Sequence, residues 1–159
     1  MTPVVYDHFL SLLPYLEILN FVESKNYNGT YNPKPQYDRN GYQNEPFFSN
    51  IHISLLSIAE EVFKKRLKPS YNYFCLYGEN GSLINHKDRL QANYTINYCI
   101  NCDNEWDLFI DDKPYTSKTN TAIFYNGREN YHYRKKIPIK FMNLVFLHYV
   151  PIDFEGNLN

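Results

Sequence analysis

The second half of this sequence is a succession of short strand patterns, and that succession constrains the fold more than any other feature. Turn-rich clusters of Gly, Asn, Asp and Pro separate the patterns. The expected strands are 71–77, 83–86, 94–101, 106–110, 121–125, 131–134 and 141–150. No helical pattern alternates with them, which excludes a parallel, Rossmann-type sheet. Strands at this spacing predict an antiparallel sandwich or jelly roll.

Helical patterns precede the strands. Apolar residues recur at helical spacing early in the chain and predict a helix over 9–24. Pro14 implies a kink in that helix, or a start late enough to place the proline in its first turn. A second apolar stripe begins at Ile51 and predicts another helix, which a basic last turn and Pro69 end.

The length and composition fit a single folded domain. A chain of 159 residues can bury a core, and a hydrophobic content of 43% is typical of globular proteins. The aromatic content of 18% favours strands. We therefore expect one α+β, mainly β domain over 1–159, with a helical part over about 1–69 and a jelly-roll core over about 70–150.

Residues 25–43 lie between the two expected helices and are rich in Asn, Tyr, Gly and Pro, which predicts a loop. A loop of this length within a compact domain is either functional or disordered. Its four tyrosines could form a lid over a substrate, or they could pack on the outside of the strand core. The sequence leaves both alternatives open.

Charge and cysteine usage limit the classes of partner. A net charge of −1 and a pI near 6.5 give no general attraction to nucleic acid or membranes. The sequence has no secretory signal and no run of about 18 apolar residues, so we expect a cytoplasmic protein. Cys75, Cys99 and Cys102 are expected as reduced, partly buried thiols, because the CxxC pair lacks a second pair for zinc.

Three side chains form the candidate functional site. His86 and Asp88 are two residues apart in an extended segment, so both point to the same face. His132, 44 residues after Asp88, can complete a set of two histidines and one carboxylate. That set covers one face of a metal ion and leaves the other open, as non-haem Fe(II) oxygen chemistry requires. His148 is the alternative third ligand.

The order of residues around this set resembles the Fe(II)/2-oxoglutarate-dependent dioxygenases, and within them the small prolyl-4-hydroxylase-like branch. Tyr77 on a strand, a glycine-containing turn, and then His86 and Asp88 match that order. Downstream, an apolar strand, a turn and His132 follow as in the family. The resemblance covers roughly 71–150 and implies a double-stranded β-helix, a form of jelly roll, with helices packed on its outside.

The resemblance also implies a reaction. Fe(II) would be held by His86, Asp88 and His132, with 2-oxoglutarate and O2 as co-substrates. The family releases succinate and CO2 while a substrate is hydroxylated, and ascorbate could be required as well. Tyr77 could hydrogen-bond 2-oxoglutarate. A peptidyl residue, a free amino acid or a small metabolite would each fit as the substrate.

The far carboxylate of 2-oxoglutarate needs a fixed cation in a barrel interior. Arg134 lies two residues after His132, so on a strand both side chains face the same way. Lys140 is the alternative, because many relatives in the family place a basic residue on the strand that follows the second histidine. Either residue could serve as the anchor.

Two other functions fit the same scaffold. A non-enzymatic jelly-roll binding module would bind no iron. An oxidative nucleic-acid demethylase would need a basic, aromatic-lined groove, which the overall charge disfavours. The sequence has neither a phosphate-binding glycine loop nor a Gly-x-Ser-x-Gly hydrolase motif.

Overall fold

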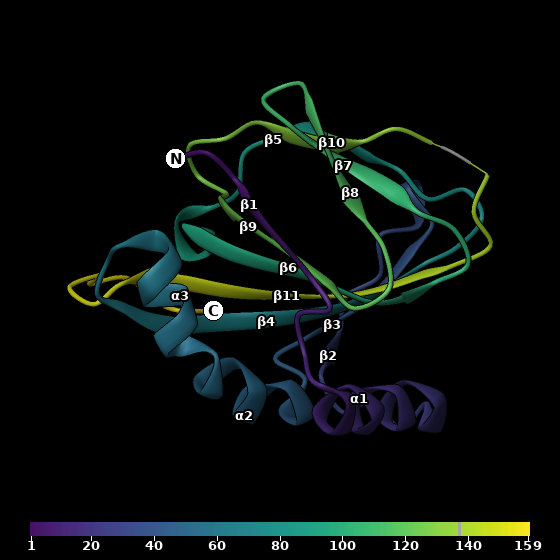
Figure 1. Ribbon diagram of the computed structural model, residues 1–159, viewed down its shortest axis with the longest axis horizontal. Coiled ribbons are helices and arrows are strands. Elements are labelled where there is room, and N and C mark those ends of the chain that lie inside the picture. Colours follow the sequence, from purple (N-terminus) through teal and green to yellow (C-terminus); the bar gives the residue numbers. More distant parts are fainter. Residues whose placement is uncertain (137) are drawn as a thin grey trace.

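The computed structural model describes residues 1–136 and 138–159, and within them the strands form two antiparallel sheets that face each other (Figure 1). The larger sheet has the order β1-β9-β6-β11-β4-β3-β2, and the smaller sheet has the order β5-β10-β7-β8. The larger sheet comprises β1 (Val4–Asp7), β2 (Thr30–Tyr31), β3 (Arg39–Gln43), β4 (Leu67–Tyr77), β6 (Tyr94–Cys102), β9 (Thr121–Asn126) and β11 (Met142–Pro151). The smaller sheet comprises β5 (Leu83–His86), β7 (Trp106–Ile110), β8 (Lys113–Ser117) and β10 (His132–Arg134).

From β4 onward the chain passes back and forth between the two sheets, and only the β7–β8 hairpin stays within one of them. This alternation is the connectivity of a jelly roll. It confirms the fold class predicted from the sequence, an α+β, mainly β chain built on a double-stranded β-helix.

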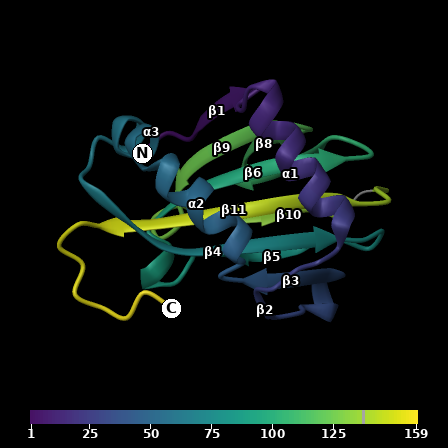
Figure 2. The same cartoon turned by 90° about the horizontal axis from the view of Figure 1, so that it is seen from below.

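Three helices cover the outer face of the larger sheet (Figure 2). They are α1 (Leu12–Ser24), α2 (Pro46–Ser54) and α3 (Leu56–Phe63), and two short 3-10 turns are η1 (Pro35–Tyr37) and η2 (Leu90–Ala92). Phe74 and Leu147 from the sheet pack with Ile18, Phe48 and Ala59 from the helices. None of the described helices is long and apolar enough to cross a membrane.

The larger sheet is buried on both faces, and strand alternation sorts its side chains into two cores. In β4, Phe74 points toward the helices, whereas Tyr73, Cys75 and Tyr77 point toward the smaller sheet. Trp106 of β7 packs its ring edge-on against Tyr77, with the centroids 5.1 Å apart. The space between the sheets is therefore lined by large aromatic side chains.

Residues 25–43 are not the loop that the sequence predicts. They contain β2, η1 and β3, and β3 pairs with β4 from Arg39 opposite Tyr77 to Gln43 opposite Tyr73. The β3 sequence, Arg-Asn-Gly-Tyr-Gln, has no apolar alternation, so a distant partner strand decides its conformation. Gly41 is required because the Tyr73 ring occupies the position of a Cβ there.

Strands β1 and β8 were also absent from the sequence-based expectation, and both are short strands completed by pairing with β9 and β7. The predicted second helix is in fact α2 and α3, which meet at Leu55, where φ −88° and ψ 1° lie outside the helical range. Helix α1 begins at Leu12, so Pro14 lies in its first turn, one of the two predicted alternatives.

One buried histidine makes the fold sensitive to acid. The ring of His52 in α2 packs against Tyr149 with the centroids 4.5 Å apart. Its Nε2 is buried and has no hydrogen-bond partner among the described residues. Burial, and then the nearby His148, lower the pKa of His52 to about 3, because a charged ring would lose its hydration.

We predict that His52 destabilises the folded state as the pH falls below 6.5, the pKa of an unperturbed histidine. As the pH falls through 6.5, His52 in the unfolded chain takes up a proton, whereas His52 in the folded protein does not. The contribution of the neutral ring to the free energy of unfolding is therefore complete above pH 6.5 and is lost progressively below it. At about pH 5 the loss is at most about 2 kcal/mol. Urea unfolding at about pH 7 and about pH 5 should show a smaller loss in His52→Phe than in wild type.

His8→Asn is the matched control, because His8 is exposed and has a positive φ that asparagine tolerates. The same pH dependence in His52→Phe and wild type would contradict the assignment.

Candidate functional site

The pairing of β5 with β10 brings together the two histidines predicted from the sequence. Their antiparallel register places His86 directly opposite His132, with the ring centroids 4.3 Å apart. Asp88 follows two residues later, and its N–H donates to the Gly127 carbonyl at 2.8 Å. Glycine is needed at 127 because a Cβ there would collide with the Asp88 carboxylate and the Ala92 carbonyl.

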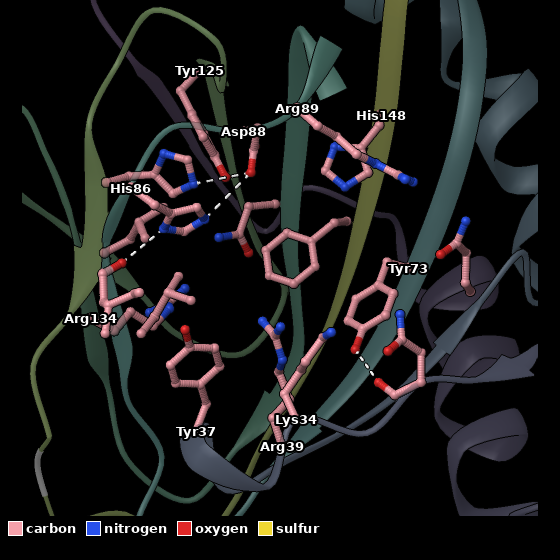
Figure 3. Close-up of a pocket in the computed structure, with 18 of the residues that line it drawn as sticks. Lys34, Tyr37, Arg39, Tyr73, His86, Asp88, Arg89, Tyr125, Arg134 and His148 are labelled. Carbon is pink, nitrogen blue, oxygen red and sulfur yellow. Dashed lines mark hydrogen bonds and ion pairs between the residues drawn. The ribbon is translucent and has the colours of Figure 1, made fainter. Parts of the chain in front are cut away.

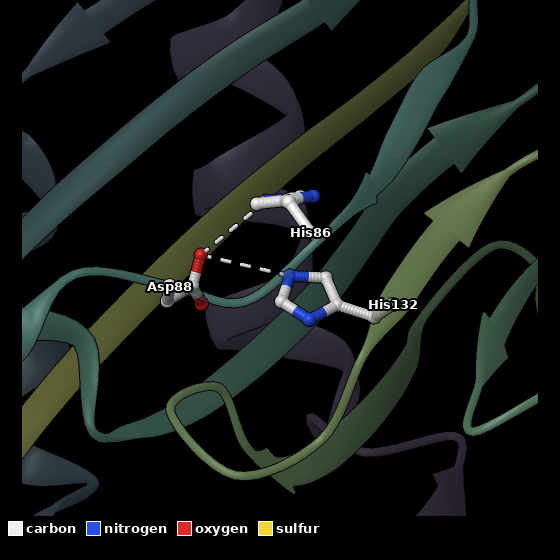
Figure 4. Close-up of side chains that lie close together, drawn as sticks. All are labelled: His86, Asp88 and His132. Carbon is white, nitrogen blue, oxygen red and sulfur yellow. Dashed lines mark ion pairs between the residues drawn. The ribbon is translucent and has the colours of Figure 1, made fainter.

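The potential ligand atoms converge on one point. Asp88 Oδ1 lies 3.5 Å from His86 Nε2 and 3.6 Å from His132 Nε2 (Figure 4). One ligand atom from each residue lies within 4.8 Å of the others. Asp88 Oδ2 is buried and has no hydrogen-bond partner among the described residues, which is unfavourable unless a cation or a donor binds it. The three side chains therefore fit a divalent metal ion.

Two backbone carbonyls orient the imidazoles. His86 Nδ1 lies 2.8 Å from the Ile84 carbonyl, and His132 Nδ1 lies 3.1 Å from the Asn130 carbonyl. A carbonyl only accepts, so each Nδ1 donates its proton there, and each Nε2 is the ring atom that can bind a metal ion once it carries no proton. Carbonyls placed in this way fix the ring orientation of metal-binding histidines.

The charges of the cluster suit a cation. Burial disfavours the charged forms of Asp88 and His86, but hydrogen bonds from His132 and His86 to Asp88 outweigh it. The pKa of Asp88 is therefore held below its usual range, and the pKa of His86 is held above its usual value. A bound metal ion would replace these protons as the partner of the carboxylate.

His148, the alternative third ligand, lies elsewhere in the pocket. Its Nδ1 is 3.0 Å from the Thr95 hydroxyl, and its ring packs on Tyr71 with the centroids 4.4 Å apart. Burial lowers the pKa of His148 to about 4, so the ring is neutral. Among the described residues, the group that can share a metal contains His132 and not His148.

A cavity of about 390 Å³ opens beside the three side chains (Figure 3). Both sheets and the segment before β4 line it. Its described lining includes four cationic side chains but one carboxylate, Asp88. The four are Lys34, Arg39, Arg89 and Arg134. The pocket is thus suited to anionic ligands.

The three residues predicted to bind 2-oxoglutarate differ in their access to this pocket. Arg134 lines it and is buried, whereas Tyr77 and Lys140 are absent from its described lining. The Tyr77 hydroxyl accepts a hydrogen bond from Arg39 Nη1 at 3.0 Å. Lys140 is exposed on the turn before β11, and its backbone N–H donates to Asp103.

The N-terminal segment contributes pocket residues beyond the tyrosine lid that the sequence left open as one alternative. Lys34, Tyr37, Arg39 and Gln43 all line the pocket. The alternation of basic and tyrosine residues was the signal available in the sequence. Their position depends on the pairing of β3 with β4, which links residues at least thirty positions apart and leaves no local pattern.

Comparison with known proteins shows which solved structures share this fold. No family model matches the sequence, and no curated protein matches it. Among solved structures, HygX from Streptomyces hygroscopicus, with nickel, 2-oxoglutarate and hygromycin B bound, superposes with a TM-score of 0.74 at 9% identity over 96% of this chain and 84% of that one. The chain has the fold of the Fe(II)/2-oxoglutarate-dependent oxygenases.

Two further structures agree. EctD from S. alaskensis, with 2-oxoglutarate and 5-hydroxyectoine, has a TM-score of 0.72 at 11% identity over 94% of this chain and 72% of that one. The collagen prolyl hydroxylase of Paramecium Bursaria Chlorella virus-1, in complex with 2-oxoglutarate, has a TM-score of 0.67 at 12% identity over 95% and 96%. The oxygenase fold expected from the sequence is therefore confirmed.

We predict that removing any one of His86, Asp88 or His132 abolishes stoichiometric metal binding, because the two remaining ligands hold the ion too weakly. Each alanine variant should lose more affinity than the roughly 10–100-fold that loss of an outer-shell partner costs. The measurement is the Fe(II) bound per chain after anaerobic loading, with thermal unfolding as the check on the fold. His8→Asn, at an exposed histidine with a positive φ, is the control. Full iron occupancy in His132→Ala would transfer the role to His148.

Proposed function

We propose that this protein is an Fe(II)- and 2-oxoglutarate-dependent oxygenase that hydroxylates a peptidyl residue, a free amino acid or a small metabolite. The observation that carries the proposal is the convergence of His86, Asp88 and His132 on the wall of a pocket. The same fold holds nickel and 2-oxoglutarate in HygX and iron in EctD. The proposal combines the ligand set of this chain with the chemistry of that scaffold.

Three side chains of the chain would bind the metal ion. His86 and His132 would hold the metal through Nε2, and Asp88 would hold it through its carboxylate. This set leaves one side of the metal open to co-substrates. Iron bound in such a site supplies the oxygen chemistry that decarboxylates 2-oxoglutarate to succinate and hydroxylates the substrate.

Other pocket residues can orient ligands and exclude water. Asn97 of β6 lines the pocket, and both polar atoms of its buried amide lack a hydrogen-bond partner among the described residues. The amide can therefore both donate to a bound ligand and accept from it. Tyr125 packs beside His132 with the ring centroids 4.9 Å apart and shields that ligand from solvent.

The two rival functions differ from this proposal in turnover and substrate. A binding module on this scaffold would take up ligands without producing succinate. A nucleic-acid demethylase gains no support from the net charge of −1. The hydroxylase and the demethylase would both use the three converging side chains and the open pocket, whereas the binding module would leave those side chains without a catalytic role.

We predict that protein loaded with Fe(II) and supplied with ascorbate converts 2-oxoglutarate to succinate when O2 is admitted. Peptide and metabolite pools that contain the substrate should accelerate the conversion. Asp88→Ala should abolish it, because the variant lacks the anionic ligand. Succinate is measured by NMR, and Asp153→Ala, at an exposed carboxylate, is the control that should retain turnover. Iron and 2-oxoglutarate bound without succinate from any pool would favour the binding module.

A further inference from the structure

Arg39 is a pocket cation that tyrosines surround and no acid neutralises. It is the first residue of β3 and lies opposite Tyr77 of β4, on the face toward the smaller sheet. Its guanidinium carbon is 5.7, 5.2 and 5.4 Å from the ring centroids of Tyr37, Tyr73 and Tyr77. None of the ion pairs between described residues involves Arg39.

Most of the hydrogen-bonding capacity of Arg39 is unused. A guanidinium has five N–H donors, and the described contacts of Arg39 fill one of them, from Nη1 to the Tyr77 hydroxyl at 3.0 Å. Its Nε is buried without a partner among the described residues. A half-buried arginine keeps its charge at any physiological pH, so these donors are available to an anion.

A second cation, Lys34, lies beside Arg39. The two residues form an antiparallel bridge in which the Lys34 N–H donates to the Arg39 carbonyl at 2.7 Å. Residues opposed in this way point to the same side. Figure 3 shows both side chains directed into the pocket. Two like charges without a carboxylate between them repel each other, and an anionic ligand would remove that repulsion.

The position of Arg39 relative to the metal ligands is fixed by the turn that precedes it. Asp38 accepts hydrogen bonds from the Asn80 N–H through its carboxylate at 2.8 Å and from the Gly78 N–H through its carbonyl at 2.9 Å. Gly78 and Asn80 lie in the turn that leads into β5, the strand that ends at His86. The backbone that carries Arg39 is therefore held against the turn before β5 whether or not a ligand is bound.

The other arginines of the pocket are engaged differently. Arg134 donates from Nη1 to the Trp106 carbonyl at 2.7 Å and from Nη2 to the Ser117 hydroxyl at 2.9 Å. These bonds tie β10 to β7 and β8 and engage both Nη atoms with protein acceptors, although the buried Nε of Arg134 also has no partner among the described residues. Arg89 is exposed, and its Nε donates to the Tyr71 hydroxyl at 3.2 Å.

We propose that Arg39, with Lys34 beside it, binds the distal carboxylate of 2-oxoglutarate in place of Arg134 or Lys140. The inference rests on the proposed function, because it assigns a residue to that co-substrate. Thr30–Tyr31 and Arg39–Gln43 lie outside residues 71–150, over which the sequence resembles the oxygenases, so the proposed anchor lies outside the metal-binding motif. Arg39 makes the site specific for a 2-oxo acid with a second carboxylate.

The test compares two probes, 2-oxoglutarate and 2-oxopentanoate, which has the same carbon chain with a methyl group in place of the distal carboxylate. Each is titrated calorimetrically into protein loaded with Ni(II), so that no turnover occurs. Wild type should bind 2-oxoglutarate at least about 30-fold more tightly than 2-oxopentanoate. Arg39→Gln should lose that preference through weaker binding of 2-oxoglutarate alone, and Arg39→Lys should retain part of it.

The controls separate this role from a general effect on the pocket. Arg128→Gln changes an exposed arginine outside the described lining and should leave both affinities unchanged. Nickel bound per chain and thermal unfolding check that Arg39→Gln is folded. Lys34→Gln should weaken the binding of 2-oxoglutarate less than Arg39→Gln does. An ammonium group is a point charge and cannot form the two parallel hydrogen bonds that a planar guanidinium makes to a carboxylate.

Three results would overturn the assignment of Arg39. The first is that Arg39→Gln binds 2-oxoglutarate with wild-type affinity. The second is that this variant loses affinity for both probes equally. The third is that only Arg134→Gln or Lys140→Gln loses affinity for 2-oxoglutarate selectively. A wild-type protein that binds nickel but neither probe would instead overturn the proposed function, and the assignment with it. The two failures are therefore distinguishable.

Discussion

The pairing of His86 with His132 across β5 and β10 is the contact on which the candidate site depends. Because antiparallel neighbours share a face, one register fixes both imidazoles on the same side, and a slip of one residue would turn one of them away. The register shift after His132 aligns Arg134 with Leu83. Leu83 can thereby face inward with His86 while Ile84, between them, is exposed. The convergence of the candidate metal ligands is thus a consequence of strand register.

The sequence predicted the parts of the fold that have local patterns. The expected strands 83–86 and 106–110 coincide with β5 and β7, and the grouping of His86, Asp88 and His132 follows from strand alternation and motif order. Of the edge elements, β2 has only two residues, and β8 contains Pro114 and directly follows a turn-rich stretch, so neither shows a strand pattern. The cage around Arg39 combines one neighbour, Tyr37, with two side chains brought from β4, so sequence alone could not reveal it.

The cations of the pocket differ in how the protein compensates them. Arg134 is buried, but it stacks on Trp106 at 5.0 Å and donates to two protein acceptors. Arg39 has one hydrogen bond and no acid, so its desolvation is compensated mainly by the faces of three tyrosines. His148 adds no charge, because burial keeps it neutral above about pH 4. The protein therefore compensates the charge of Arg39, with Lys34 beside it, less completely than that of Arg134.

An identity of 9–12% with structures that share the fold has a physical explanation. Two facing sheets require only that alternate residues be apolar or aromatic, and many sequences meet that condition. The metal site adds three side chains and a glycine at 127, where the backbone approaches Asp88. Segment β3 is held to the strand that carries His86 by the Asp38 contacts with Gly78 and Asn80. Because neither contact involves the side chain of Arg39 or of His86, a substitution at Arg39 leaves this link between the two segments in place.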